Sequence, residues 1–342
     1  MNLSDVSRFY KGKVILVTGG AGSVGSELVK KILKYQPRSV RVLDVDETRL
    51  FELEQELTSA RVRIFVGDVR DKTRLRRAVE EVDIVFHAAA LKHVPLCEYN
   101  PFEAVQANVL GTQNAIDVSM DEEVDKFIMI STDKAVNPIN VMGATKLLAE
   151  RLTLSANLYR GSRKTAFSCV RFGNVMGSRG SAVSVFCNQI SSRSPLTVTD
   201  PGMTRFVMSL DTSAELVLKA GALAKGGETF VLRMPALRII DLVGVMMEES
   251  LGRYGHDQSA LGTRIVGKRS GEKLHEELMT EEEAKHAYEA SGMLVIPSYT
   301  EHRKDKTIAR CRDLQYKSNQ VSLLTKDEIR EMVRHVIPSL QG

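Results

Sequence analysis

Short apolar runs alternate with amphipathic stretches along the first half of the chain. The stretch Glu27–Lys34, for example, places Leu28, Ile32 and Leu33 on one face of a helix. Strands that alternate with helices in this way indicate parallel βαβ units and a doubly wound sheet. We expect strands at Val14–Val17, Val40–Leu43, Val62–Val66, Ile84–Phe86, Phe127–Ile130 and Ala166–Val170.

The pattern loosens after Phe172, where residues 173–201 are rich in Gly, Ser, Asn and Pro. A later apolar run at Thr229–Leu232 indicates a return to the sheet. Amphipathic stretches predict further helices at 211–224, 240–251, 281–289 and 326–335.

These patterns predict an α/β fold, a Rossmann-type doubly wound parallel sheet with a smaller substrate-binding lobe. The sheet domain is expected at 1–177 and 207–235, and the lobe at 178–206 and 236–300. Residues 301–342 are expected to form a C-terminal tail that packs on the body or on a partner subunit.

Composition narrows the class of protein. The 342 residues are 43% hydrophobic and 26% charged, with a net charge of +4, which is ordinary for a soluble globular protein. Basic residues are interleaved with acidic ones, so no nucleic-acid-binding surface is predicted. No apolar stretch reaches the length of a membrane span, and no signal peptide is recognisable. The four cysteines have neither metal-ligand spacing nor a disulfide framework. We therefore expect a cytoplasmic protein without a metal site.

A glycine-rich loop, Thr18-Gly19-Gly20-Ala21-Gly22-Ser23-Val24-Gly25, follows the first predicted strand and opens the first helix. In that setting a GxxGxxG loop lets the backbone approach a pyrophosphate at the helix N-terminus. Asp44 ends the second strand, where a carboxylate accepts hydrogen bonds from the adenosine ribose and repels a 2′-phosphate. The sequence therefore predicts NAD rather than NADP. The predicted cofactor-binding residues are Gly19, Gly22, Ser23, Val24, Gly25 and Asp44, with Asp68, Val69, Ala88 and Ala89 at later strand ends.

The segment from Ser131 to Lys146 reads STDKAVNPINVMGATK. A short-chain dehydrogenase would place its catalytic tyrosine four residues before the lysine, where this chain has Met142. A thioether cannot exchange a proton with an alcohol. Asp133 and Lys134 follow a predicted strand instead, and we expect Asp133 to shuttle a proton. Lys134 can act as a base if it is neutral, which burial and the positive charge of Lys146 would favour.

Several blocks together resemble the extended short-chain dehydrogenase/reductase family. Within it the chain is most similar to the UDP-N-acetylglucosamine 4,6-dehydratases of polysaccharide and glycan biosynthesis. The resemblance covers nearly the whole chain, and its most specific blocks are STDKAVNP, MTRF and GEKLHEEL. The remaining blocks are TGGAGSVGSEL from Thr18, HAAALKHVPLCEYNPFEAVQANVLGT from His87 and RFGNVMGSRGS from Arg171.

The resemblance implies roles for particular residues. Lys146 would hold the nicotinamide ribose, and Asn108 would order the active-site helix and a water. Thr132, Asp133 and Lys134 would face the hexose of a UDP-sugar, implied to be UDP-N-acetylglucosamine. A homo-oligomer, a dimer or a hexamer, is also implied. The residues implied along the UDP-sugar path are Lys92, Asn174, Arg205, Arg269 and Glu272, of which Lys92 is also assigned to the cofactor side together with Asn108.

The reaction implied is oxidation at C4, removal of the C5 proton, loss of the C6 hydroxyl and return of the hydride to C6. A UDP-hexose 4-epimerase or 4-ketoreductase on the same scaffold is an alternative, although both normally rely on the missing tyrosine. A catalytically silent NAD-binding protein is a second alternative, against which Asp133, Lys134 and Lys146 argue. Inversion or retention at C5 stays open, because Asp44 resembles the retaining branch and GEKLHEEL the inverting one. A preference for UDP-glucose also stays open.

Overall fold

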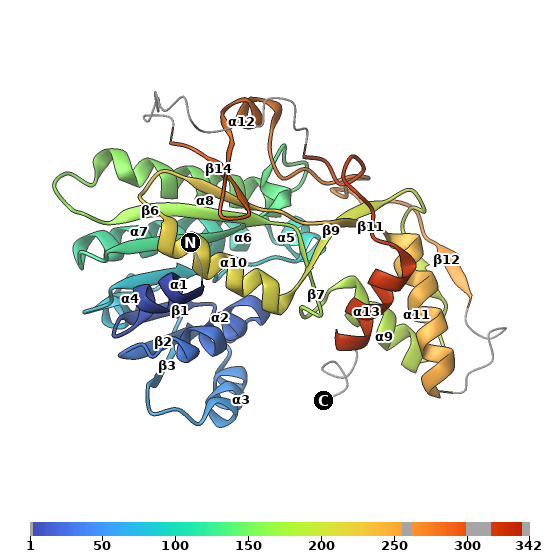
Figure 1. Ribbon diagram of the computed structural model, residues 1–342, viewed down its shortest axis with the longest axis horizontal. Helices are drawn as coiled ribbons and strands as arrows, with labels where there is room; N and C mark the ends of the chain where they lie inside the picture. Colours follow the sequence, from blue (N-terminus) through green and yellow to red (C-terminus); the bar gives the residue numbers. More distant parts are fainter. Residues whose placement is uncertain (1–2, 255–261, 299–315, 337–342) are drawn as a thin grey trace.

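A mostly parallel sheet forms the centre of the computed structural model, which describes residues 3–254, 262–298 and 316–336 (Figure 1). Within these ranges the sheet has nine strands in the order β13-β14-β10-β6-β5-β4-β1-β2-β3. All neighbours pair in parallel except β14, which is antiparallel to both β10 and β13. The strands are β1 (Val14–Thr18), β2 (Ser39–Asp44), β3 (Val62–Val66), β4 (Ile84–His87), β5 (Lys126–Thr132), β6 (Ala166–Phe172), β10 (Thr229–Leu232), β13 (Tyr288–Ala290) and β14 (Met293–Ile296).

The strand order confirms the predicted doubly wound fold. The first six strands lie in the order 3-2-1-4-5-6, and each contains one of the apolar runs expected from the sequence. The order reverses between β1 and β4. Open α/β sheets bind their ligands at such a switch point, outside the carboxyl ends of the strands.

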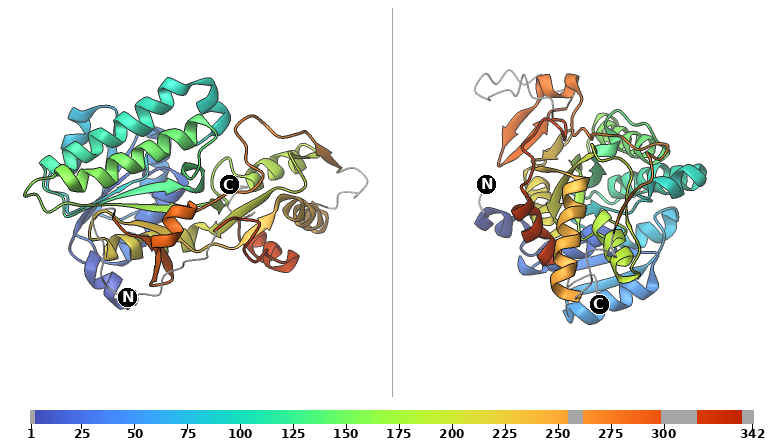
Figure 2. Two further views of the ribbon diagram at one scale, coloured as in Figure 1. Left: turned by 90° about the horizontal axis from the view of Figure 1, so that it is seen from above. Right: turned by 90° about the vertical axis from the view of Figure 1, so that its right-hand side faces the viewer.

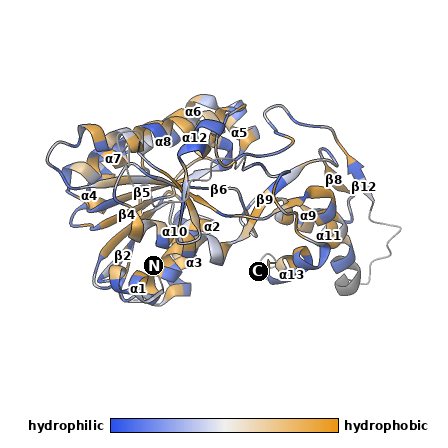
Figure 3. Ribbon diagram, turned by 45° about the horizontal axis from the view of Figure 1, so that its top comes forward, coloured by the Kyte–Doolittle hydropathy of each residue, from blue (hydrophilic) through white to orange (hydrophobic). Residues whose placement is uncertain are grey.

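Helices cover both faces of the sheet (Figure 2). Side chains of β1 alternate between the two layers, with Ile15 and Val17 in one apolar cluster and Leu16 in the other. Figure 3 shows the resulting apolar interior between the helix layers. The first cluster includes α1 (Leu3–Tyr10), α2 (Ser23–Lys34), α3 (Glu47–Leu57) and α10 (Leu210–Leu223), and the second includes α4 (Lys72–Val79), α7 (Gly111–Asp121) and α8 (Val141–Tyr159).

A smaller lobe with its own apolar cluster lies beside the sheet, on the right of Figure 1. Part of the tail belongs to it, because Ile329 and Val333 are buried in this cluster. Residues 301–315 and 337–342 of the predicted tail lie outside the described residues. The elements of the lobe are β7 (Asn174–Met176), α9 (Ala182–Ser191), β8 (Leu196–Val198), β9 (Thr204–Ser209), β11 (Ala236–Arg238), α11 (Ile239–Tyr254), β12 (Thr263–Ile265) and α13 (Lys326–Val336).

Two parts of the predicted division are wrong. Residues 1–177 are expected in the sheet domain, but β7 within them pairs with β9 in the lobe. Residues 236–300 are expected in the lobe, but β13 and β14 within them extend the main sheet. The predicted helix at 281–289 is correspondingly shorter: α12 (Glu281–His286) ends before Tyr288 enters β13. The helix ends early because the next residues pair as a strand: Tyr288 lies opposite Val295 of β14, and β14 itself pairs with β10.

A buried charge cluster ties three elements together beside the sheet. The guanidinium of Arg171, on β6, donates to both carboxylate oxygens of Glu150 on α8, at 3.1 and 2.7 Å. It also donates to both oxygens of Glu283 on α12, at 3.0 and 3.1 Å, and to the carbonyl of Leu278. Although burial disfavours the charged form, the two carboxylates raise the pKa of Arg171. The cluster therefore holds α8 and α12 against β6.

We predict that Arg171→Met destabilises the protein strongly, because it leaves two carboxylates buried without their partner. Breaking a buried pair in this way costs about 3–5 kcal/mol of unfolding free energy. Urea denaturation measures the loss. Arg49→Met is the matched control, because Arg49 pairs with Glu52 on the surface and such pairs contribute about 0–1 kcal/mol. Equal stability of the two variants would contradict the prediction.

Candidate active site

The candidate site lies at the carboxyl ends of β1, β4 and β5, next to the switch point. The glycine-rich loop follows β1, Ala88 and Ala89 follow β4, and Asp133 and Lys134 follow β5. Among the described residues, no group of three or more His, Cys, Asp or Glu side chains is arranged to hold a metal ion.

The backbone of the glycine-rich loop packs too closely to accept side chains at Gly19 and Gly25. Gly19 has a φ of +64°, and a Cβ there would lie 2.6 Å from the backbone nitrogen of Ala89. A Cβ on Gly25 would lie 2.2 Å from the carbonyl oxygen of Gly19. Gly22 precedes α2, whose first residues are Ser23 and Val24, so the free N–H groups of the helix start at this loop. This cradle fits the pyrophosphate of a dinucleotide.

Asp44 lies beside this loop at the end of β2. Its carboxylate accepts hydrogen bonds from the N–H of Ala21 at 3.0 Å and of Asp46 at 3.2 Å. The side chains of Asp68 and Val69, two other predicted cofactor-binding residues, already have partners within the protein. Arg70 donates to both carboxylate oxygens of Asp68, and Val69 is buried in the second apolar cluster. Asp44 thus has the placement expected of a ribose-binding carboxylate, while Val69 packs in the core.

Asn108 links two walls of the site. It lies in a π-helical turn, Gln106–Leu110, a feature often found at functional sites. Its side-chain amide exchanges hydrogen bonds with the backbone of Leu91 at 2.8 and 3.0 Å and donates to the hydroxyl of Thr145 at 3.0 Å. Next to Thr145, Lys146 donates to the carbonyl of Ile130 at 2.6 Å, and burial lowers its pKa to about 8.

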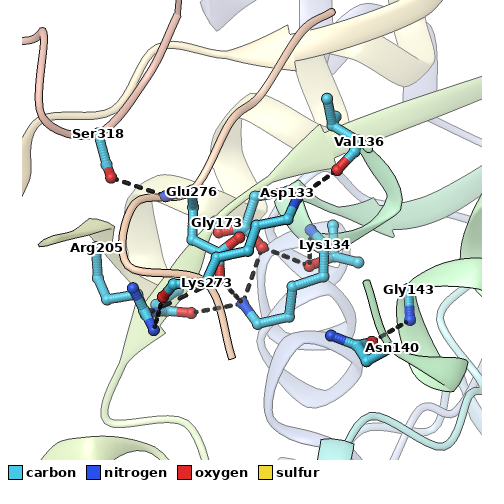
Figure 4. Close-up of polar contacts among 12 residues, drawn as sticks. Asp133, Lys134, Val136, Asn140, Gly143, Gly173, Arg205, Lys273, Glu276 and Ser318 are labelled. Atoms are coloured by element: carbon cyan, nitrogen blue, oxygen red, sulfur yellow. Dashed lines mark hydrogen bonds and ion pairs between the residues drawn. The ribbon is translucent and has the colours of Figure 1, made fainter. Parts of the chain in front are cut away.

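Asp133 and Lys134 point toward each other at the end of β5 (Figure 4). The Asp133 side chain has no solvent exposure. Its Oδ1 accepts hydrogen bonds from the hydroxyl of Thr132 at 2.8 Å and from Lys134 Nζ at 3.0 Å. Its Oδ2 is buried and has no hydrogen-bond partner. A buried carboxylate oxygen without a donor is costly and therefore indicates a ligand position.

The charges around Lys134 oppose the neutral form that a role as base requires. Burial disfavours the ammonium form, but the charges of Asp133 and Glu276 outweigh burial and raise the pKa of Lys134. Lys146 donates to the carbonyl of Ile130 and is not among the charges that shift the pKa of Lys134. The substrate-free protein therefore holds Lys134 as an ammonium ion.

Met142 is part of an apolar cluster on the first turn of α8. The cluster contains Cys97 and Ala104, and Met142 itself is 3% exposed. These partners come from the short helices α5 (Val94–Tyr99) and α6 (Pro101–Val105). Met142 thus contributes packing and takes no part in the polar contacts around Asp133.

The predicted substrate residues form separate groups. Asn174 accepts from Lys134 Nζ at 3.4 Å, and Arg205 is buried beside Glu276, so both border the candidate site. Arg269 and Glu272 lie together in a loop, where the Glu272 carboxylate accepts from the Arg269 N–H at 3.3 Å. Lys92 donates to the carbonyl of Arg179 at 2.9 Å.

Two residues of the site were not singled out from the sequence. Arg179 crosses the glycine-rich loop: its guanidinium donates to the carbonyl of Ala21 and its N–H to Ser23 Oγ at 3.0 Å. Glu276 is 3.5 Å from Lys134 Nζ. Arg179 lies in the sequence block RFGNVMGSRGS, and Glu276 lies in GEKLHEEL. The only local signal for Arg179 was its place between two glycines of the segment GSRG.

The model of the polysaccharide biosynthesis protein family matches residues 15–298. The chain belongs to this family. An uncharacterized membrane protein of Methanocaldococcus jannaschii is 58% identical over 333 residues, which cover 97% of this chain and 98% of the relative. In the described part of this chain, no helix has both the length and the apolar character needed to cross a membrane.

Relatives with named activities match most of the chain as well. The inverting UDP-N-acetylglucosamine 4,6-dehydratase of Campylobacter jejuni is 42% identical over 289 residues, 84% of this chain and 83% of the relative. The UDP-glucose 4-epimerase of Rickettsia felis is 36% identical over 336 residues, 95% of this chain and 96% of the relative. Among solved structures, Pen from Bacillus thuringiensis has a TM-score of 0.90 and 41% identity, covering 96% of this chain and 98% of its own. The resemblance drawn from the sequence blocks is confirmed.

We predict that Gly25→Ala abolishes tight dinucleotide binding, because the added Cβ would collide with the Gly19 carbonyl. The affinity for NAD, measured by calorimetry, should fall by about tenfold or more, which corresponds to about 1.4 kcal/mol or more. Gly262→Ala is the control, since nothing lies within 4 Å of a Cβ there. Unchanged affinity in Gly25→Ala would show that the loop does not hold the pyrophosphate.

Proposed function

We propose that this protein is a nucleotide-sugar dehydratase that converts UDP-N-acetylglucosamine to a UDP-4-keto-6-deoxy sugar. The observation that carries the proposal is the contact between buried Asp133 and partly buried Lys134 at the end of β5, with Met142 at the position of the usual tyrosine. Acid–base chemistry beyond a hydride transfer needs such a pair. The 42% identity to the Campylobacter dehydratase supports the proposal.

The cofactor proposed is NAD. The glycine-rich loop would hold its pyrophosphate, Asp44 its adenosine ribose and Lys146 its nicotinamide ribose. NAD held there would supply the hydride acceptor for oxidation at C4 and the hydride donor for C6. The protein's own side chains are proposed to orient the hexose, exclude water and move protons.

Asp133 is proposed to move one proton twice. Its free Oδ2 accepts the proton of the C4 hydroxyl as C4 is oxidised, and Thr132, hydrogen-bonded to Oδ1, helps to orient the hydroxyl. Asp133 then gives this proton to the C6 hydroxyl, which leaves as water. Lys134 removes the C5 proton after it has itself lost a proton, and later returns a proton to C5.

The UDP-sugar is proposed to lie along the wall formed by Asn174 and Arg205, with Arg205 toward the diphosphate. Lys92, Arg269 and Glu272 are proposed to contact the same path from the surrounding loops. A homo-oligomer is proposed from the resemblance to the dehydratases.

A 4-epimerase of UDP-hexoses is the second candidate, because the Rickettsia epimerase is 36% identical over 95% of this chain. An epimerase needs redox chemistry at C4 but no base at C5. The two activities therefore differ in the mass of the product.

We predict that the purified protein, given UDP-N-acetylglucosamine, releases a nucleotide sugar lighter by one water. Asp133→Asn and Lys134→Met should each lower kcat by about two to four orders of magnitude, as expected for a positioned acid–base group. Met142→Leu should retain most turnover, because it preserves size and apolar character. Mass spectrometry and steady-state kinetics measure these outcomes, after NAD binding of each variant has been verified.

Other products would decide between the alternatives. An unchanged mass with a new C4 epimer would support the epimerase. No reaction with several UDP-sugars would support a catalytically silent protein. If Met142→Leu were inactive while Asp133→Asn stayed active, the residue roles would be wrong.

We also predict that NAD binds more tightly than NADP, because the Asp44 carboxylate would repel a 2′-phosphate. Calorimetry on protein stripped of co-purified dinucleotide measures both affinities. Equal or tighter binding of NADP would count against the role given to Asp44.

A further inference from the structure

Glu276 is a buried carboxylate that the proposed mechanism does not use. Its side chain is 3% exposed, and it lies in the segment that leads toward α12. The backbone around it is fixed on both sides: the N–H of Glu276 donates to Ser318 Oγ at 2.9 Å, and its carbonyl accepts from the N–H of Ser318 at 2.9 Å. Ser318 Oγ is in turn 2.6 Å from Thr204 Oγ1 on β9. The position of the Glu276 side chain is therefore set by the fold.

The carboxylate of Glu276 points at Lys134 (Figure 4). Its Oε1 lies 3.5 Å from Lys134 Nζ, which is also 3.0 Å from Asp133 Oδ1. Arg205 Nε is 4.0 Å from the same Glu276 oxygen. Lys134 thus lies between two buried carboxylates, and its own side chain is 21% exposed.

Each carboxylate keeps one oxygen without a partner. Asp133 Oδ2 and Glu276 Oε2 are both buried and accept no hydrogen bond within the described structure. Two such oxygens beside one ammonium are expensive to bury unless a ligand supplies the donors. Sugar hydroxyls are donors of the required kind.

We infer that Glu276 is a positioning residue for Lys134. Together with Asp133, Glu276 holds the lysine side chain in place and keeps it an ammonium ion until substrate binds. This inference rests on the proposed function only in calling Lys134 the base. The charged groups that face Lys134 are Asp133 from the end of β5, Glu276, and Arg205 from β9, and Asn174 is its neutral neighbour on β7.

The arrangement has a consequence for pH dependence. Lys134 must lose one proton to solvent before it can accept the proton of C5, so activity rises with pH through the titration of Lys134. Opposite charges within about 4–6 Å move a pKa by about one to three units. Removing the charge of Glu276 therefore moves the titration of Lys134 to lower pH, while Asp133 continues to hold the side chain.

NMR of lysine ε-carbons in the substrate-free protein tests this directly, with the Lys134 signal assigned by Lys134→Arg. At about pH 10.4, where ordinary lysines are half titrated, wild-type Lys134 should still be mostly charged. In Glu276→Gln its midpoint should fall by about one to three units. Glu277→Gln is the matched control, since Glu277 pairs with Lys317 at 3.3 Å instead, and it should leave the midpoint unchanged.

The pH dependence of kcat/KM, which reports groups of the free enzyme, gives the second readout. Its acid limb should move to lower pH in Glu276→Gln and stay near the wild-type position in Glu276→Asp, which keeps the charge. An equal midpoint in wild type and Glu276→Gln overturns the inference. A wild-type Lys134 that is already neutral at about pH 10.4 also overturns the inference, and this result does not depend on whether the variant folds. Because the NMR readout needs no turnover, it decides the role of Glu276 even if the protein dehydrates no UDP-sugar.

Discussion

The guanidinium of Arg171 places a full charge in the interior, and this charge constrains the positions of the elements that surround it. Removing an ion from water costs several kcal/mol unless partners with good geometry surround it. Here Glu150 and Glu283 each accept two hydrogen bonds from it, and the Leu278 carbonyl accepts another. Neither α8 nor α12 can move away from β6 without exposing an unpaired buried charge. The three elements therefore behave as one rigid unit.

The candidate site is built on both sides of this unit. On one side, Ser131 Oγ donates to Glu150 at 2.5 Å, which fixes the end of β5 immediately before Thr132 and Asp133. On the other side, the Leu278 carbonyl bonded to Arg171 lies two residues after Glu276. One buried cation thus sets the positions of both carboxylates that flank Lys134. The distances in the candidate site follow from a contact that includes none of its acid–base groups.

Local features were predictable and distant contacts were not. The strand β1 is buried on both faces, so its sequence is a continuous apolar run, and the glycine-rich loop was recognisable from the glycine spacing that follows this strand. The charge state of Lys134 depends on Asp133, its neighbour in sequence, and also on Glu276, which only the folding of a much later segment brings near. Tyr288 likewise joins a strand because β14 offers it a partner, and no local periodicity encodes that pairing.

The packing of Met142 explains why this later segment matters. A tyrosine at that position would keep the proton chemistry on α8, within a single helix. Met142 instead packs against Cys97 and Ala104, and the proposed acid–base groups lie at the end of β5 and in the segment that faces it. The segment around Glu276 faces the end of β5. Lys273, in the same segment, attaches it there by donating a hydrogen bond to the Val136 carbonyl at 2.6 Å. In this arrangement the proposed acid–base site is complete only when that segment has folded against the sheet domain.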